Sequence, residues 1–463
     1  NKIVEKFPFW AQILYSSGNI GIFIADRVWV TFMLYFYLPP AESGMPELIS
    51  NRTFLGFLTV AGLVTIFGRT VDAIADPLVA AWSDRSKSKL GRRKMFLTFG
   101  GLPLMLASVL LFFPPSSEPG TANAIYMAIM LGILLFFFTF YTAPWLALIP
   151  ELSHTDRERI NIVTLQAVFS LIGTVIVMVG GYLIWGKLES SGMDKTSALQ
   201  FTVVILGFIG LIFCYLAVIP INEKRYCASV PSDTGLVESI KLTFSNRPFL
   251  LYLFGTMCLI FGVNIISQTA PYYVTVLLQK KEAFASSVFG AIFVVALIFF
   301  PIINLLCRYI EKRIIMIIGL SIFAICSFLL YFLGTETLPF SPINQAFIIF
   351  GLIGIPVSIV FIVLNAIVSD LAEYDAIKTG SKREAMYFGA QGFLMKINLG
   401  ISTLILAFLF SGFGKDLANP LGVKLSGPVA ALVCAIGIIL FMFYPEKKIM
   451  DVLEENRRTP KEM

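Results

Sequence analysis

The sequence predicts an all-α membrane protein of twelve transmembrane helices, arranged as two pseudo-symmetric six-helix bundles. The first supporting observation is composition: 57% of the 463 residues are hydrophobic, 14% are charged and the mean hydropathy is +0.83. Soluble domains are about 45–50% apolar and about 25% charged. Too few polar side chains remain to cover a water-facing surface, so lipid must surround much of the fold. The composition excludes a soluble enzyme and a disordered chain.

The second observation is that polar residues and Gly or Pro breaks divide the chain into twelve apolar runs. Each run is close to the roughly 20 residues that cross a bilayer as a helix. Runs such as MLGILLFFFTF do not alternate apolar and polar side chains, as the strands of a membrane barrel would. We therefore predict helices over residues 10–38, 53–82, 95–114, 123–148, 162–186, 199–221, 248–279, 284–307, 314–334, 342–368, 387–412 and 426–445.

The third observation is that basic residues gather in alternate connections. If the N-terminus is cytoplasmic, the inside segments hold 25 of the 35 Lys and Arg residues and the outside segments hold seven. This bias predicts that both termini are cytoplasmic and that the chain is a multi-pass protein of the plasma membrane, which in bacteria is the inner membrane. The basic residues lie in short loops rather than on one face, so no nucleic-acid partner is expected.

A long polar connection over residues 222–247 divides the predicted helices into two sets of six. We predict an N-terminal bundle over 1–221, a cytoplasmic linker over 222–247, a C-terminal bundle over 248–445 and a cytoplasmic tail over 446–463. Pro77 and Pro301 occupy similar places in the two halves. This organisation is typical of the major facilitator architecture, in which substrates bind near the midplane between the halves. We expect a monomer in contact with membrane lipids.

Ionisable residues at membrane depth are costly, so each is a functional candidate. The second predicted helix reads FGRTVDAIADPLVAAW, which places Asp72 and Asp76 on one face with Arg69 one turn earlier. Two carboxylates held together in a low dielectric favour uptake of a proton or a hard cation. The alternative is that Arg69 neutralises one carboxylate in a packing network, but one arginine does not balance two carboxylates. Pro77 frees backbone carbonyls beside the site.

Charges at the helix ends suggest a gate. The loop SDRSKSKLGRRK places Asp84 among basic residues that include Arg85, Arg92 and Arg93. It reads as a positive-inside anchor at anionic headgroups, and Asp84 and the arginines are also candidates for inter-helix salt bridges that close one face. Asp26 and Arg27 on the first predicted helix form either a structural network or part of such a gate.

Four stretches of the chain resemble a known family, the glycoside-pentoside-hexuronide:cation symporters, which include the melibiose carrier. They are DAIADP with the following DRSKSKLGRRK, FTFYTAPWLALIPEL, DRERIN and SDLAEYDAIKTGSKREAMYF. The resemblance spans both halves and implies that Asp72 and Asp76 bind the coupling cation, with the hydroxyl of Thr139 completing the site. Ala75 stands where the melibiose carrier has Asn, which leaves both Na⁺ and H⁺ as candidate ions.

The resemblance also shows where the chain departs from sugar carriers. The positions that grip the galactoside in the melibiose carrier read here Ile22, Phe23, Thr142, Leu146 and Ala167, whereas Lys396 is retained. The expected substrate-binding residues are Lys396, Phe23, Thr142, Asn264 and Gln268. An apolar wall with a few cations suits an amphiphile with a negative headgroup. The sodium-dependent lysophosphatidylcholine symporter of vertebrates also resembles this family, so a lysophospholipid is one candidate substrate.

These observations predict a cation-coupled symporter of an organic solute that works by alternating access. The alternatives are a symporter of sugars or glycosides and a passive uniporter. We expect no enzyme, because the sequence shows no combination of nucleophile, base and orienting group, and no phosphate-binding loop. The six cysteines are scattered without metal-like spacing, so no cofactor is expected apart from the coupling ion.

Overall fold

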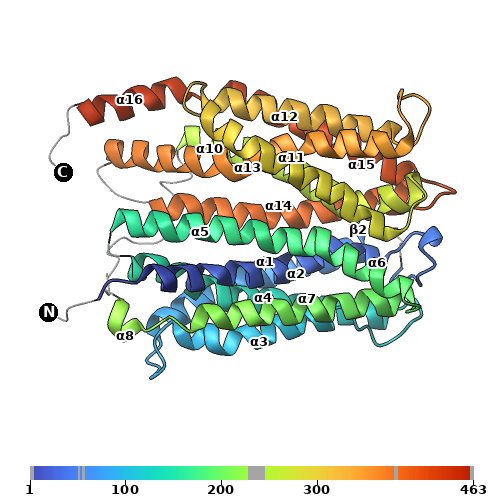
Figure 1. Cartoon of the computed structure of the whole chain (residues 1–463), viewed down its shortest axis with the longest axis horizontal. Helices are drawn as coiled ribbons and strands as arrows, with labels where there is room; N and C mark the ends of the chain where they lie inside the picture. Colours follow the sequence, from blue (N-terminus) through green and yellow to red (C-terminus); the bar gives the residue numbers. More distant parts are fainter. Residues whose placement is uncertain are drawn as a thin grey trace. The chain divides into compact units, whose positions relative to one another are not determined.

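The computed structural model describes residues 5–50, 53–54, 58–153, 155–227, 246–379 and 384–458. These residues are helical almost throughout, as Figure 1 shows. They fall into two compact units. The first is Asn1–Pro231 together with Lys280–Ser286, and the second is Ser232–Gln279 together with Ser287–Met463.

The first unit contains six long helical segments. They are α1 (Phe9–Tyr37), α2 (Val60–Arg85), α3 (Lys94–Leu110), α4 (Thr121–Leu152), α5 (Asp156–Val175) with its continuation, and α7 (Lys195–Val218). The continuation of α5 is a π-helix, η2 (Ile176–Gly181), followed by α6 (Tyr182–Ser190). Shorter elements are η1 (Ala41–Ser43), α8 (Glu223–Tyr226), η4 (Glu282–Phe284) and the antiparallel pair β1 (Thr53–Phe54) and β2 (Leu58–Thr59).

The second unit also contains six long helical segments. They are α10 (Arg247–Tyr272), continued by the π-helix η3 (Tyr273–Leu277), α11 (Ala285–Leu306), α12 (Lys312–Leu329) with η5 (Leu330–Phe332), α13 (Pro342–Thr379), α14 (Glu384–Phe413) and α15 (Leu421–Met442). A final amphipathic helix, α16 (Glu446–Arg458), packs on α13.

The twelve predicted spans each correspond to one of these long helical segments. In the described part of the chain, ten are long and apolar enough to cross a membrane on length and composition alone. The other two are α2, which carries Arg69, Asp72 and Asp76 within its apolar stretch, and α3, which has 17 residues. The charges of α2 therefore lie inside one of the predicted membrane spans.

Several helix ends differ from the predicted ones because capping, rather than hydropathy, sets them. The helix predicted from residue 53 begins at Val60, where the Thr59 hydroxyl accepts a hydrogen bond from the Gly62 N–H at 3.0 Å. The helix predicted from residue 162 begins at Asp156, where Thr155 accepts from the Glu158 N–H in a capping box. The helix predicted to end at residue 368 continues through polar sequence to Thr379.

The helix α1 is the core of the first unit, since it packs against α5 and α7 and 83% of its apolar stretch is buried. Gly21 allows this contact: a Cβ there would lie 2.5 Å from the Gly210 carbonyl oxygen of α7. Between Tyr15 and Tyr37, the side chains of α1 that are not buried are those of Phe23, Asp26 and Arg27. These three side chains are therefore the least buried ones in the central part of α1.

The two units repeat one capping arrangement. In the first, the carboxylate of Glu223, just after the sixth long helical segment, accepts from the N–H groups of Arg92, Arg93 and Lys94 at 2.7, 2.8 and 2.5 Å. In the second, Glu446 likewise accepts from Lys312 and Arg313 at 2.8 and 2.6 Å. A carboxylate at a helix N-terminus satisfies free N–H donors and complements the helix dipole.

This repeat adds to the equivalence of Pro77 in α2 and Pro301 in α11, and together they show that the two bundles share one plan. The linker predicted over 222–247 lies mostly outside the described residues, so its place between the bundles stays a prediction.

Candidate cation and substrate site

Close packing of α2 on α4 builds the candidate cation site. A Cβ at Gly68 would meet the side chains of Leu131 and Leu135 at 3.0 Å, and one at Gly132 would meet Phe67 at 3.3 Å. Asp72 follows Gly68 by one helical turn, and Thr139 follows Gly132 by two turns. The small residues therefore bring the aspartate and the threonine together.

Thr139 lies between the two carboxylates that the sequence singled out. Its Oγ1 is 2.8 Å from Oδ1 of Asp72 and 3.0 Å from Oδ1 of Asp76. Asp72 is 1% exposed and Thr139 is fully buried, whereas Asp76 is half-buried. Thr139 is thus within hydrogen-bond distance of both carboxylates that were predicted to bind a cation with it.

The proton count of this cluster leaves room for one positive charge. A threonine hydroxyl carries one hydrogen and donates to one carboxylate at a time. A proton on a carboxyl group, or a cation that bridges the oxygens, would satisfy the second contact and reduce the repulsion between the two carboxylates. The geometry therefore fits H⁺ and Na⁺ equally.

Arg69 offsets one of the two negative charges. Its Nη1 lies 3.1 Å from Oδ2 of Asp72, its guanidinium lies 5.2 Å from the centre of the Trp29 ring, and its side chain is 12% exposed. The Arg69 Nε has no hydrogen-bond partner among the described residues. The charges of Arg69, Asp72 and Asp76 sum to −1, which one monovalent cation neutralises.

The ligand set is a small one. In the described part of the chain, no group of three or more His, Cys, Asp or Glu residues is placed to hold a metal ion. Two carboxylates and a hydroxyl supply few oxygens for a divalent ion such as Ca²⁺, which takes six to eight.

Asp26, Arg27 and Phe23 are half-buried neighbours in the middle of α1. Arg27 Nε lies 3.3 Å from Oδ2 of Asp26, and its guanidinium is 5.8 Å from the centre of the Phe23 ring. The Asp26 and Arg27 side chains are 22% and 27% exposed. An Asp–Arg pair in the middle of a membrane-length helix is typical of the bundle interior or a polar cavity rather than a lipid contact. Thr142, on α4, donates to the Phe138 carbonyl of its own helix at 2.7 Å.

The predicted substrate residues of the second bundle lie on α10 and α14. Gln268 is 3% exposed, accepts from the Thr403 hydroxyl at 3.0 Å and donates to the Asn264 carbonyl at 3.2 Å. Asn264 is 6% exposed, and Lys396 is half-buried on α14. Each bundle therefore carries its own polar residues at membrane depth.

The basic loop after α2 makes a salt bridge that the sequence did not reveal. Glu151, near the end of α4, accepts from Nη2 of Arg92 at 2.6 Å and from Nη2 of Arg93 at 2.9 Å. Arg85 is exposed, and the side chain of Asp84 lies outside the described residues. Glu151 falls inside one of the resembling stretches, but its spacing from the loop gave no sign of the pairing.

A fold that is helical almost throughout, with ten described helices long and apolar enough to cross a membrane, is that of an integral membrane protein. A family described as MFS/sugar transport protein matches residues 14–448. The chain belongs to this family.

Comparisons with individual proteins agree with this assignment. The chain is 25% identical to the "Uncharacterized symporter YnaJ" of Bacillus subtilis, over 98% of this chain and 95% of that protein. It is 22% identical to the "Glucuronide carrier protein homolog" of Escherichia coli, over 96% and 95%. Its fold resembles the crystal structure of a bacterial homologue of the lysosomal transporter Spinster, with a TM-score of 0.65, 12% identity and coverage of 96% and 97%.

Proposed function

We propose that this protein is a cation-coupled symporter of an organic anion, working by alternating access. The observation that carries the proposal is the convergence of Asp72 and Asp76 on the single hydroxyl of Thr139, with Arg69 paired to Asp72. Two carboxylates that share one hydroxyl favour uptake of a monovalent cation. Coupling requires that bound cation raise the affinity of the protein for the substrate, and bound substrate then raises the affinity for the cation by the same factor.

Both Na⁺ and H⁺ are candidate ions. Ala75 is 1% exposed and contributes no ligand beside Asp76, so the carboxylates and Thr139 supply the side-chain oxygens. A proton needs only one of these carboxylates, whereas Na⁺ needs several oxygens, including the backbone carbonyls that Pro77 leaves free. Titration of the protein with Na⁺ and with pH, in the absence of any substrate, distinguishes binding of Na⁺ from binding of H⁺.

Two observations support an organic anion as substrate. Lys396 lies at membrane depth on α14, and a relative of similar length is named for glucuronides, which are anionic. Apolar Ile22, Phe23, Leu146 and Ala167, at the positions that grip a sugar in the melibiose carrier, favour an amphipathic anion, of which a lysophospholipid is one form. A neutral glycoside is the alternative substrate, since the family includes sugar transporters. We further propose that both termini are cytoplasmic and that the chain acts as a monomer.

Purified protein in liposomes tests the coupling. A thermal-shift screen with a glucuronide, its neutral glucoside counterpart and a lysophospholipid, each with and without Na⁺, first identifies a ligand. We expect an inward Na⁺ or H⁺ gradient to drive that ligand above its outside concentration. The contrary result is that the protein lets the ligand equilibrate across the membrane to the same extent with and without either gradient. This would show a passive uniporter and refute the symport proposal.

Replacement of Lys396 by Ala is expected to weaken binding of the acidic ligand more than that of its neutral counterpart. A hydrogen bond to a charged group contributes about 1.5–3 kcal/mol, which is roughly a 10- to 100-fold change in affinity. Binding of the glucuronide and the glucoside is measured by thermal shift in parent and variant. Equal affinity of both proteins for the glucuronide would remove Lys396 from the substrate site.

A further inference from the structure

A short segment from the second half of the sequence is seated in the first bundle. Residues Lys280–Ser286 join the end of η3 to the start of α11, yet they belong to the first compact unit. We call this stretch the Glu282 segment. It lies where α1 ends and α7 begins, at the opposite end of α1 from the N-terminus.

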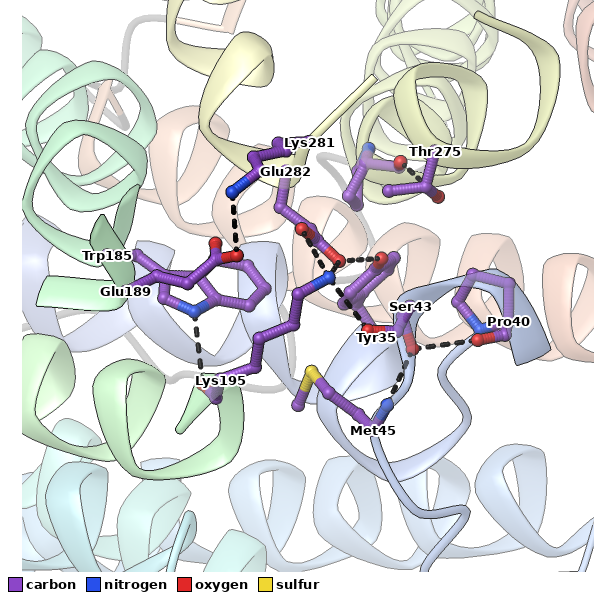
Figure 2. A network of polar contacts seen from close by, with 11 residues as sticks. Tyr35, Pro40, Ser43, Met45, Trp185, Glu189, Lys195, Thr275, Lys281 and Glu282 are labelled. Carbon is purple, nitrogen blue, oxygen red and sulfur yellow. Dashed lines mark hydrogen bonds and ion pairs between the residues drawn. The ribbon is translucent and has the colours of Figure 1, made fainter. Parts of the chain in front are cut away.

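Glu282 anchors the segment through a buried carboxylate. Its Oε1 accepts from the Tyr35 hydroxyl at 3.1 Å, and its two oxygens accept from the Lys195 ammonium at 3.1 and 3.2 Å. Lys195 also donates to the Ser43 carbonyl at 2.8 Å. Figure 2 shows the ammonium surrounded by these oxygens. The Glu282 side chain is 1% exposed and that of Lys195 is 27% exposed, so the pair is largely removed from water.

Steric fit complements this charge pair. A Cβ added at Gly186 of α6 would lie 2.3 Å from the Cβ of Ala283, so only glycine allows the segment to sit this close. Next to it, the Lys281 ammonium lies 3.3 Å from Oε1 of Glu189. Figure 2 shows this second pair beside the first. The seat therefore has a charged contact on each side of a close backbone approach.

Irregular backbone adjoins the seat on both sides. The π-helix η3 ends two residues before Gln279, the one described non-glycine residue with a positive φ, at 51°. The π-helix η2 directly precedes α6, which carries Gly186 and Glu189. π-Helical turns and left-handed non-glycine residues are strained and are frequent at functional hinges. Irregular backbone therefore lies next to the Glu282 segment and next to the helix that carries Gly186 and Glu189.

We propose that the Glu282 segment is a releasable latch: its carboxylate is docked on Lys195 and Tyr35 in one access state and leaves this seat in the other. The segment is covalently joined to the second bundle at both of its ends, so a movement of the bundles that exchanges access must pull on it. On release, Glu282 and Lys195 regain hydration, which offsets the lost Coulomb attraction and keeps the two states close in free energy. An apolar plug would lack this compensation.

A steric pair of variants tests whether the seat holds the segment. In a background carrying Ser286→Cys, whose parent serine is 5% exposed, the rate of alkylation by a hydrophilic maleimide is followed by peptide mass spectrometry. We expect Gly186→Ala, and separately the isosteric Glu282→Gln, to raise this rate by roughly tenfold or more. Adding Ala283→Gly to Gly186→Ala removes the clash and is expected to restore the parent rate. Gly290→Ala, which adds a Cβ with nothing within 4 Å, is the matched control.

A covalent lock tests whether release is part of transport. Cysteines that replace Glu189 and Lys281 are joined by a short bifunctional methanethiosulfonate, which reducing agent removes. We expect the lock to abolish uptake of the ligand found by the thermal-shift screen, and reduction to restore it, while either single cysteine variant treated alike keeps its uptake.

Three results would each refute the proposal. The first is that Gly186→Ala and Glu282→Gln leave the alkylation rate of the Ser286→Cys background unchanged. The others are that Ala283→Gly fails to rescue, or that the locked protein transports at the parent rate. The latch rests on alternating access but on neither the ion nor the solute. If Asp72→Asn abolishes cation coupling while the alkylation response is as expected, the latch proposal therefore still holds. If the alkylation response is absent while Asp72→Asn abolishes cation coupling, the cation-site proposal still holds.

Discussion

Replacing Asp72 by Asn is expected to abolish accumulation driven by a cation gradient while leaving the protein folded. The amide keeps the shape of the side chain and still accepts from Thr139, whose hydroxyl lies 2.8 Å from Oδ1 of Asp72. It removes a full negative charge, and a charge about 4 Å from a cation contributes about 4 kcal/mol at an effective dielectric of 20. That corresponds to roughly a thousandfold loss of cation affinity. Uptake into liposomes under an imposed Na⁺ or H⁺ gradient measures the effect.

Variants of Thr139 provide the matched controls for this result. Thr139→Ser retains the hydroxyl between the two carboxylates and is expected to transport like the parent, whereas Thr139→Val keeps the shape and loses the oxygen. We expect Thr139→Val to weaken the cation dependence of uptake less than Asp72→Asn does, because Thr139→Val removes a neutral ligand rather than a charged one. Gradient-driven uptake at the parent level in both Asp72→Asn and Asp76→Asn would show that this cluster does not bind the coupling ion.

The fold could be predicted because a membrane restricts the available structures so strongly. An apolar run of about 20 residues has few alternatives to a spanning helix, and this alone located all twelve long segments. The helix ends were less predictable, since they depend on single polar contacts such as the hydrogen bond from the Gly62 N–H to Thr59. Hydropathy reports where lipid ends, and a capped helix can begin before that point or, like α13, extend beyond it.

The candidate cation site was predictable for a related reason. Charges in an apolar span are few, so Asp72 and Asp76 stood out, and their helical spacing placed them on one face. The partners of charged residues outside the spans were not predictable, because Glu151 and Glu282 come from sequence distant from Arg92 and Lys195. Nothing in the local pattern of a loop indicates which distant helix end it will contact. The structure therefore adds most at the helix ends, where salt bridges and the Glu282 segment lie.

Glu151→Gln is expected to lower the stability of the first bundle, because this one carboxylate pairs with two arginines. Glu151 and Arg93 are each 11% exposed at the side chain, and Oε1 of Glu151 serves both Arg92 and Arg93. Removing the carboxylate leaves two guanidinium groups side by side against a neutral amide. Breaking a buried pair by removing one partner costs about 3–5 kcal/mol, and the 35% exposure of the Arg92 side chain places the expected loss near the lower end of that range.

Thermal unfolding of purified protein measures this loss, and an exposed carboxylate on the same bundle gives the control. Glu5 and Arg225 also form a short ion pair, with Oε2 to Nη2 at 2.6 Å, but both side chains are more than half exposed, so Glu5→Gln is expected to leave the midpoint unchanged. A drop of several degrees for Glu151→Gln alone would show that burial, rather than contact distance, makes the pair stabilising. Equal midpoints for the parent and Glu151→Gln would mean that the two arginines are solvated well enough without it. The loop after α2 would then be held by the Glu223 cap on α3 and not by the end of α4.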